Sequence, residues 1–326
     1  MDAPDFFSRE EGDLVAWFNH RRIPHHERVD FYRLFFTEQQ LWKSVKRDVK
    51  LPNDKKREEI IRFLIDSEVI IGAVLAGQRM GKDALVCDLL QEVKNRLGRR
   101  IRIVTLGNPS APFITAPGVG FVEPGDAYFN LLDVPGGTRE CPVLIYTSEL
   151  DLFFPARDFN SQSNKALNAQ LNTLAQNHQK ILGCAKLAAN VDVSFWRACN
   201  FKLFKYITED NLQFERGGNS YSFLTPAGLL IRPKDPHDKR TVLAVFQDKY
   251  LTITHDPPAW YSRAFSEQFN SVNFTDEHAL SFARGIRLLN DDKKVYGQMS
   301  IEIATRYRFN RSPEWYRERL EGTANL

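Results

Sequence analysis

The chain has 326 residues, of which 43% are hydrophobic, and its formal net charge is +3. This length and composition allow a sizeable core in one large domain or two. The nearly balanced charge excludes a chain that is basic throughout, so any nucleic-acid surface would have to be local. The four cysteines (Cys87, Cys141, Cys184 and Cys199) are far apart and form no C-x-x-C pair, which indicates reduced thiols rather than disulfides.

The beginning of the chain and its hydropathy predict a cytoplasmic protein. Residues 1–13 are acidic and lack the apolar segment of a signal peptide. No run approaches the roughly 18 apolar residues that a membrane-spanning helix needs. We therefore expect no membrane span, and a location in the cytoplasm of a cell or of an infected host cell.

Residues 1–68 are predicted to form a helical N-terminal region that packs on the next domain. Apolar residues recur there at helical spacing. They are Leu14, Val15, Trp17, Phe18, Phe31, Leu34, Phe35 and Leu41 before a break at 51–54, and Ile60, Ile61, Leu64 and Ile65 after it.

Residues 69–208 alternate apolar strand-like runs with helical patterns, which predicts an α/β domain with a mostly parallel sheet. The expected strands are 69–75, 101–106, 143–147, 181–185 and 201–207. Residues 107–142 are rich in glycine and proline and too long for a simple connection. We expect that stretch to be an ordered insertion or a mobile loop.

Residues 209–326 are predicted to form a small α+β C-terminal part. Two β-hairpins are expected first, one from 213–216 and 221–224 around Gly217-Gly218-Asn219, the other from 241–246 and 251–254. Helices are expected from about residue 275 to the end.

The most informative motif lies between the strand at 69–75 and a helix whose apolar residues recur through 85–93. It fits the phosphate-binding pattern G-x-x-x-x-G-K-[ST] with two departures. The residues are Ala76, Gly77, Gln78, Arg79, Met80, Gly81, Lys82, Asp83 and Ala84. Small residues let backbone N–H groups surround an anion, and the dipole of the helix N-terminus favours its negative charge. Lys82 is expected to bind the outer phosphates. The alternative is a strand–helix turn with an ordinary surface lysine.

A second motif follows the strand at 143–147, which ends in Ser148 and Glu149. Its pattern predicts Ser148 on the metal side and Glu149 as the acid that polarises water. Asp151 is the second candidate for the missing acid. A buried strand that ends in ordinary solvated acids is the alternative.

The departures from the two motifs compensate each other. Ala76 in place of the first glycine is mild, because Gly77 keeps the backbone free. Asp83 replaces the Ser or Thr that reaches Mg²⁺, and Ser148 replaces the usual metal-side aspartate. An exchange of the two side chains keeps one carboxylate and one hydroxyl beside the metal, so we expect Asp83 and Ser148 to position Mg²⁺. Two independent losses would be the alternative.

With both motifs placed, residues 69–208 resemble the additional-strand, catalytic-glutamate P-loop ATPases, specifically the FtsK/HerA-type branch. That branch includes zonular-occludens-toxin-like proteins and genome-packaging ATPases of membrane-containing viruses. Residues 148–157 resemble its acidic motif followed by an aromatic residue and an arginine, and residues 167–186 resemble its next helix and core strand. Lys186 stands where the family often has a glutamine sensor, and it is either a phosphate sensor or a surface lysine.

The resemblance implies ATP and Mg²⁺ as ligands and a homo-oligomeric ring around double-stranded DNA, with viral or plasmid proteins as further partners. A neighbouring subunit would supply an arginine, for which Arg157 and Arg197 are candidates. Residues 157–205 also hold more lysine and arginine than acid, which suits the phosphates of DNA or nucleotide or else a solvated basic face.

Residues 300–320 resemble a helix-turn-helix, with Ser312 as cap and Pro313 at the first position of the second helix. Three arginines would then meet DNA phosphates or base edges: Arg311, Arg317 and Arg319. Many other helix pairs share this pattern.

The sequence therefore predicts an ATP-hydrolysing, DNA-associated motor that translocates or packages DNA. One alternative is a P-loop switch or partition ATPase. Another is a degenerate nucleotide-binding module with a structural or DNA-binding role.

Overall fold

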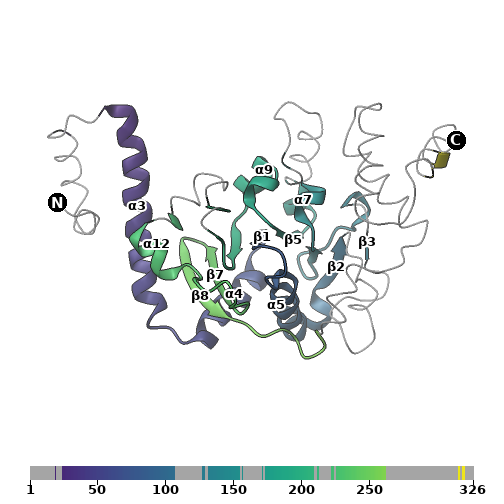
Figure 1. Ribbon diagram of the computed structural model, residues 1–326. Coiled ribbons are helices and arrows are strands. Elements are labelled where there is room, and N and C mark those ends of the chain that lie inside the picture. Colours follow the sequence, from purple (N-terminus) through teal and green to yellow (C-terminus); the bar gives the residue numbers. More distant parts are fainter. Residues whose placement is uncertain are drawn as a thin grey trace.

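The computed structural model describes most of the chain between residues 24 and 261 (Figure 1). The described residues are 19, 24–106, 127–128, 131–154, 156, 171, 173–208, 211–212, 222–223, 225–261, 315 and 318–319.

An eight-stranded sheet in the order β3-β2-β4-β5-β1-β6-β7-β8 forms the centre of the molecule. Its strands are β1 (Ile71–Leu75), β2 (Arg102–Leu106), β3 (Ala127–Tyr128), β4 (Val143–Thr147), β5 (Gln179–Ala185), β6 (Phe201–Phe204), β7 (Thr241–Phe246) and β8 (Lys249–Thr254). Neighbours from β3 to β6 run parallel, and β7 and β8 add an antiparallel hairpin beside β6. The predicted α/β class with a mostly parallel sheet is confirmed. In this order β5 lies between β1 and β4, so the strand before the glycine loop and the strand before the acidic motif are not direct neighbours.

The five strands expected in 69–208 are all present, with ends shifted by at most three residues. The hairpin expected at 241–254 is also present, but it extends the same sheet. The sheet therefore crosses residue 208, where the sequence suggested a boundary, because β7 pairs with the otherwise open edge of β6. Within 107–142, the short strand β3 was not anticipated.

Helices cover both faces of the sheet. They are α3 (His25–Asp48), α4 (Asn53–Asp66), α5 (Lys82–Leu97), α7 (Leu150–Phe153), α9 (Val193–Ala198) and α12 (Pro226–Ile231), with 3-10 turns at Gly98–Arg100, Leu131–Asp133 and Ala188–Asn190. One core cluster joins α4 and α5 to the sheet, and a second joins α7, α9 and α12 to the opposite face. In Figure 1, α4 and α5 lie below the sheet, and α7 and α9 lie above it.

Helix α5 begins and ends at glycines in the left-handed region, Gly81 (φ 73°) and Gly98 (φ 56°). Seven of its apolar residues are buried: four in a row from Ala84 to Cys87, then Leu89, Leu90 and Val93. The first turns of the helix are therefore enclosed on most sides, and the remainder packs by one face. This packing fixes the N-terminus of α5 at the carboxyl end of β1.

The N-terminal helices bind the outer backbone of β8. The Asn53 side chain donates to the Thr254 carbonyl (3.1 Å) and accepts from its N–H (2.8 Å). Two positions earlier, Thr252 donates to Asp48 (3.0 Å) and accepts from Lys56 (3.1 Å). Helices α3 and α4 are thus packed against the edge strand of the sheet.

Several expectations lie largely outside the described residues. Of the hairpin arms at 213–216 and 221–224, the structure describes Ser222 and Phe223, which are helical. Of the predicted helix-turn-helix it describes Trp315, Glu318 and Arg319, also helical. None of the helices in the described segments is long and apolar enough to cross a bilayer.

Gly183, on β5, generates a prediction about stability. A Cβ there would lie 2.5 Å from Leu150 Cδ1 and 2.8 Å from Thr147 Cγ2, distances at which the neighbours must move. Gly183→Ala should lower the free energy of unfolding by about 1–3 kcal/mol through overpacking, measured by urea denaturation. Gly136→Ala is the control, because its nearest neighbour would lie at 3.6 Å. Equal stability of the two variants would contradict this account of α7 packing on β5.

Candidate functional site

The candidate site lies at the edge of the sheet where the parallel strands end. The loop 76–81 joins β1 to α5, Ser148 and Glu149 follow β4, and Lys186 follows β5. Parallel sheets bind ligands at this edge, because loops and helix N-termini converge there. The structure therefore brings together the two motifs that the sequence placed 65 residues apart or more.

The loop backbone has the shape expected of an anion-binding turn. Arg79 (φ 59°) and Gly81 (φ 73°) are both left-handed, a conformation that helps to form concave arrays of N–H groups. Gln78 and Arg79 are exposed, whereas Ala76 is buried at the end of β1. The left-handed turn at Gly81 leads directly into the N-terminus of α5, where the helix dipole favours negative charge.

Lys82 is folded over this loop. Its ammonium donates to the carbonyl oxygens of Ala76 (3.0 Å) and Gly77 (3.1 Å). The positive charge is therefore held at the loop by neutral acceptors, which phosphate oxygens can replace.

Asp83, the next residue, has a partner that the sequence did not reveal. Its Oδ1 accepts a hydrogen bond of 2.5 Å from the hydroxyl of Tyr146, a buried residue of β4. Burial raises the pKa of the Asp83 carboxyl, while the Tyr146 hydroxyl, Lys82 and the Cys184 thiol act in the opposite direction. Burial and the Asp83 charge likewise raise the pKa of Tyr146.

Ser148 lies two residues after Tyr146 and directly follows β4. It is buried, with 8% of its surface exposed. Among the described residues, no hydrogen bond joins Ser148 to Asp83, and Tyr146 instead donates to that carboxylate. The direct carboxylate–hydroxyl pair in the structure is thus Asp83 with Tyr146.

The donor set fits a magnesium ion bound largely by substrate and water. The described residues contain no group of three or more His, Cys, Asp and Glu that could hold a metal alone. Mg²⁺ in nucleotide sites commonly takes only one or two protein oxygens, the rest coming from phosphates and water. Asp83 and Ser148 supply that number.

Glu149 and its neighbours form the acidic side of the site. Its carboxylate reaches solvent, but the protein around it raises its pKa to about 7, first by desolvation and then through the charges of Asp151 and Asp83. Lys82 and Lys186 partly offset this rise. Lys186 is exposed, and its charge also acts on Asp151. Lys82, Asp83, Glu149 and Lys186 therefore share one electrostatic environment.

Asp151 is less accessible than Glu149. Burial raises the pKa of its carboxyl, and its Oδ1 is buried with no hydrogen-bond partner among the described residues. A buried, unpaired oxygen is a poor position from which to activate solvent water.

Among the described lysines and arginines of 157–205, three make internal contacts instead of forming a basic face. Lys180 donates to two carbonyls at the end of α4 (2.9 Å each), Lys202 lies over the Trp196 ring at 4.8 Å, and Lys205 is fully buried. Of the described members, Lys186 and Arg197 are exposed. The rest serve internal contacts because a buried ammonium needs acceptors.

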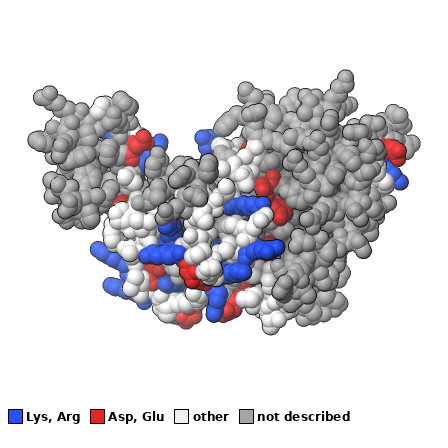
Figure 2. Space-filling model, in the orientation of Figure 1, with Lys and Arg blue, Asp and Glu red and all other residues white. Residues whose placement is uncertain are grey.

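The described part of the face drawn in Figure 2 carries charges of both signs. On the face drawn in Figure 2, described lysines and arginines alternate with acids. Of the candidate arginines, Arg197 lies in the last turn of α9, and Arg157 lies outside the described residues, as do Arg311 and Arg317. The guanidinium of Arg319 stacks over Trp315 at 4.5 Å.

No protein-family model matches the sequence, and no curated protein matches it. Among solved structures, the genome packaging NTPase B204 from Sulfolobus turreted icosahedral virus 2 is similar in its complex with ATP-gammaS, at 9% identity and a TM-score of 0.40, over 59% of this chain and 98% of that one. Its complex with AMPPCP is similar at 10% identity and a TM-score of 0.41, over 59% of this chain and 99% of that one. B204 from Sulfolobus Turreted Icosahedral Virus, a DNA-packaging ATPase, is similar at 10% identity and a TM-score of 0.36. The match covers 58% of this chain and 97% of that one. Similarity this distant does not extend to activity or partners, and the fold assignment depends on the strand order.

The Tyr146–Asp83 hydrogen bond can be tested by Tyr146→Phe, which keeps the ring and removes the donor. The half-buried carboxylate then loses its hydrogen-bond donor, and the free energy of unfolding should fall by about 1–3 kcal/mol at neutral pH. The loss should shrink in acid. Because the missing bond normally lowers the pKa of Asp83, the variant is penalised only while that carboxyl is ionised.

Urea unfolding at several pH values measures this difference. Tyr128→Phe is the matched control, since that hydroxyl accepts a hydrogen bond from Arg102 (3.0 Å) in the partly exposed strand β3. A loss for Tyr146→Phe that stays constant as the pH falls would contradict the pairing with Asp83.

Proposed function

We propose that this chain is an ATP-hydrolysing motor that acts on double-stranded DNA as a homo-oligomeric ring in the cytoplasm of a cell or of an infected host cell. One observation carries the nucleotide part of the proposal. Lys82, on the loop between β1 and α5, and Glu149, at the end of β4, meet at the carboxyl edge of one parallel sheet.

In this proposal the loop and Lys82 bind the phosphates. The N–H groups at the start of α5 face the inner phosphates, and Lys82 exchanges the carbonyls of Ala76 and Gly77 for oxygens of the outer ones. Residues 77–81 shape the loop, with Arg79 and Gly81 in the left-handed region.

Asp83 and Ser148 would hold Mg²⁺ directly or through water. The ion, when bound, neutralises charge that develops on the phosphates. Tyr146 orients the Asp83 carboxylate by donating to Oδ1, so that Oδ2 remains for the metal or its water. Tyr146 therefore acts through Asp83 rather than on the substrate.

Glu149 would take a proton from the attacking water. Its pKa of about 7 leaves a carboxylate ionised above neutral pH that is also basic enough to accept a proton. Lys186, in the same electrostatic environment, is placed to contact a terminal phosphate oxygen as a sensor.

The DNA and ring parts of the proposal rest on the resemblance of the two motifs to the FtsK/HerA-type branch. A neighbouring subunit would contribute Arg157 or Arg197. A degenerate nucleotide-binding module is the second candidate, because Asp83 stands at the hydroxyl position of the loop and its carboxylate is occupied by Tyr146.

ATPase measurements with and without duplex DNA separate these functions. DNA-stimulated hydrolysis would support the motor, and hydrolysis indifferent to DNA would support a switch or partition ATPase. Binding of ATP without turnover would support the degenerate module.

Lys82→Ala should abolish most nucleotide binding. Among the described contacts, Lys82 is the side chain that donates to the loop carbonyls of Ala76 and Gly77, where the outer phosphates would bind. We expect ATP affinity by calorimetry to fall at least tenfold while the thermal unfolding curve is retained. Lys43→Ala, an exposed lysine on α3, is the control. Unchanged ATP affinity in Lys82→Ala would remove the basis of the proposed site.

Glu149→Gln should bind ATP and hydrolyse it about 10²- to 10⁴-fold more slowly, since an amide cannot accept the proton. In the wild type, kcat/KM should fall as the pH drops through about 7, where Glu149 becomes protonated. Steady-state rates between pH 5.5 and 9 measure both effects, with Asp151→Asn in parallel. If Asp151→Asn is inactive and Glu149→Gln is not, Asp151 is the base.

A further inference from the structure

Lys205 lies beside the phosphate loop without belonging to either motif. It directly follows β6, and its backbone N–H donates to the carbonyl of Leu75, the last residue of β1 (3.0 Å). Its side chain is fully buried. A Cβ on Gly81 would lie 3.7 Å from Lys205 Nζ, so the ammonium sits against the turn that leads into α5.

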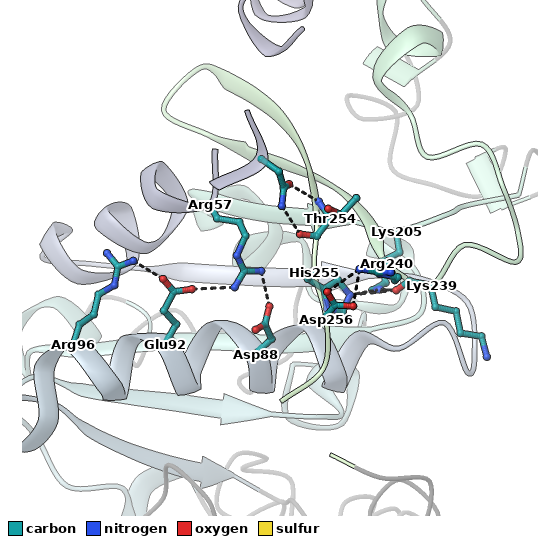
Figure 3. Close-up of polar contacts among 11 residues, drawn as sticks. Arg57, Asp88, Glu92, Arg96, Lys205, Lys239, Arg240, Thr254, His255 and Asp256 are labelled. Carbon is teal, nitrogen blue, oxygen red and sulfur yellow. Dashed lines mark hydrogen bonds and ion pairs between the residues drawn. The ribbon is translucent and has the colours of Figure 1, made fainter. Parts of the chain in front are cut away.

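The ammonium of Lys205 has neutral acceptors. It donates to the backbone carbonyl of Lys239 and to His255 Nε2 (2.8 Å). An ammonium carries three N–H donors, and the described contacts account for two. Figure 3 shows Lys205, Lys239 and His255 together beside the N-terminal end of α5.

The charges around Lys205 leave it without a counter-ion. Within the described segments it forms no ion pair. The carboxylate of Asp238 favours the charged form of Lys205 from a distance, but it accepts a hydrogen bond from Thr241. The positive charges of Lys82 and Lys239 disfavour the charged form of Lys205. Burial is the largest effect and lowers the pKa of Lys205 to about 8, while the Cys184 thiol also faces it.

His255 cannot balance this charge. Burial, Lys205, Arg57 and Arg240 lower its pKa to about 3, so the ring is neutral. Its Nε2 lies 2.8 Å from Lys205 Nζ and 3.2 Å from the Lys239 carbonyl oxygen, and it accepts from the ammonium in the tautomer that carries the ring proton on Nδ1. Nδ1 is buried without a partner among the described residues. His255 is a positioning residue for the ammonium.

Two other cations that lie at least partly inside the described structure are compensated. Arg57, drawn in Figure 3, forms ion pairs with Asp88 (2.6 Å) and Glu92 (2.9 Å) on α5. Lys180 donates to two carbonyls at the C-terminal end of α4, where the helix dipole is negative. A buried charge without such compensation is costly unless an anion binds beside it.

We propose that Lys205 is a second phosphate ligand of the nucleotide site, which contacts the inner phosphates from the side opposite Glu149. This role of Lys205 rests on the proposed ATP binding. In the sheet, β4 with Glu149 lies on one side of β1 and β6 with Lys205 on the other. Because water must attack the terminal phosphate near Glu149, the inner phosphates extend toward β6.

The first test compares Lys205→Met with Lys202→Met, which removes a half-buried lysine from the preceding strand β6. Calorimetry with ATP and ADP should show a loss of at least tenfold for Lys205→Met, similar for both nucleotides, because both carry the inner phosphates. Lys202→Met should bind like the wild type. Circular dichroism and thermal unfolding establish that each variant is folded.

The second test uses the wild type alone and so does not depend on a folded variant. An anion beside Lys205 should raise its pKa from about 8, so ADP binding at pH 8.5 should take up roughly half a proton or more. Binding enthalpies in two buffers with different ionisation enthalpies measure the uptake. At this pH Glu149, with a pKa of about 7, is already ionised. Proton uptake that persists undiminished in folded Lys205→Met would assign it to another group and overturn the proposal.

The outcomes separate the two proposals. If the wild type binds no nucleotide, the proposed function fails and the role of Lys205 fails with it. If Lys82→Ala loses affinity while Lys205→Met binds like Lys202→Met, the nucleotide site stands and Lys205 is structural. If Lys205→Met is unfolded, absence of proton uptake in the wild type overturns the phosphate role, and its presence supports it.

Discussion

The central strand β1 is hydrogen-bonded in parallel on both sides, to β5 from Ile71 to Leu75 and to β6 from Gly72 onward. This constraint aligns the ends of the three strands, so that loop 76–81, Lys186 and Lys205 emerge at one edge. The pairing needs small residues where the layers approach closely. A Cβ on Gly72 would lie 2.7 Å from a Leu182 methyl group, and Gly183 is crowded in the same way. Loop 76–81, Lys186 and Lys205 are positioned by this register, whereas Ser148 and Glu149 are positioned by the pairing of β4 with β5.

The hydrogen bond from Tyr146 to Asp83 adds a second connection across the site. It joins the first turn of α5 to β4, which β5 separates from β1. Movement of α5 relative to the acidic strand would therefore break a short contact to a half-buried carboxylate. The loop that would bind phosphate and the acid that would activate water are held as one rigid unit.

Much of the sheet could be predicted from sequence because its strands are continuous apolar runs bounded by polar residues. Lys82 and Glu149 could also be predicted, since a lysine after a glycine turn and an acid after a buried strand are local patterns. The role of Tyr146 could not be predicted, because a tyrosine inside an apolar strand is interpreted as a core residue. Its hydrogen bond to Asp83 also joins positions 63 residues apart in the chain. The signal that could have found it is its position two residues before Ser148.

Lys205 and the extent of the sheet were missed for a related reason. A lysine near other lysines suggests a solvated basic surface, and only the packing of β7 and β8 against β6 shows that Lys205 is buried. Likewise, the hairpin pattern of 241–254 predicts two paired strands but does not reveal which neighbour they join. Residue spacing describes local geometry, whereas burial and pairing depend on segments distant in the chain.

The side chains of Asp48, Asn53 and Lys56 on β8 have a consequence for how the chain behaves outside its native state. They bind the N–H and carbonyl groups of Thr252 and Thr254 on the side away from β7. A shortened chain starting at residue 69 would lack all three and present an open strand edge, a template for pairing with another molecule. The N-terminal helices thus protect the sheet from aggregation, and a fragment cut to the ATPase-like core would be expected to self-associate.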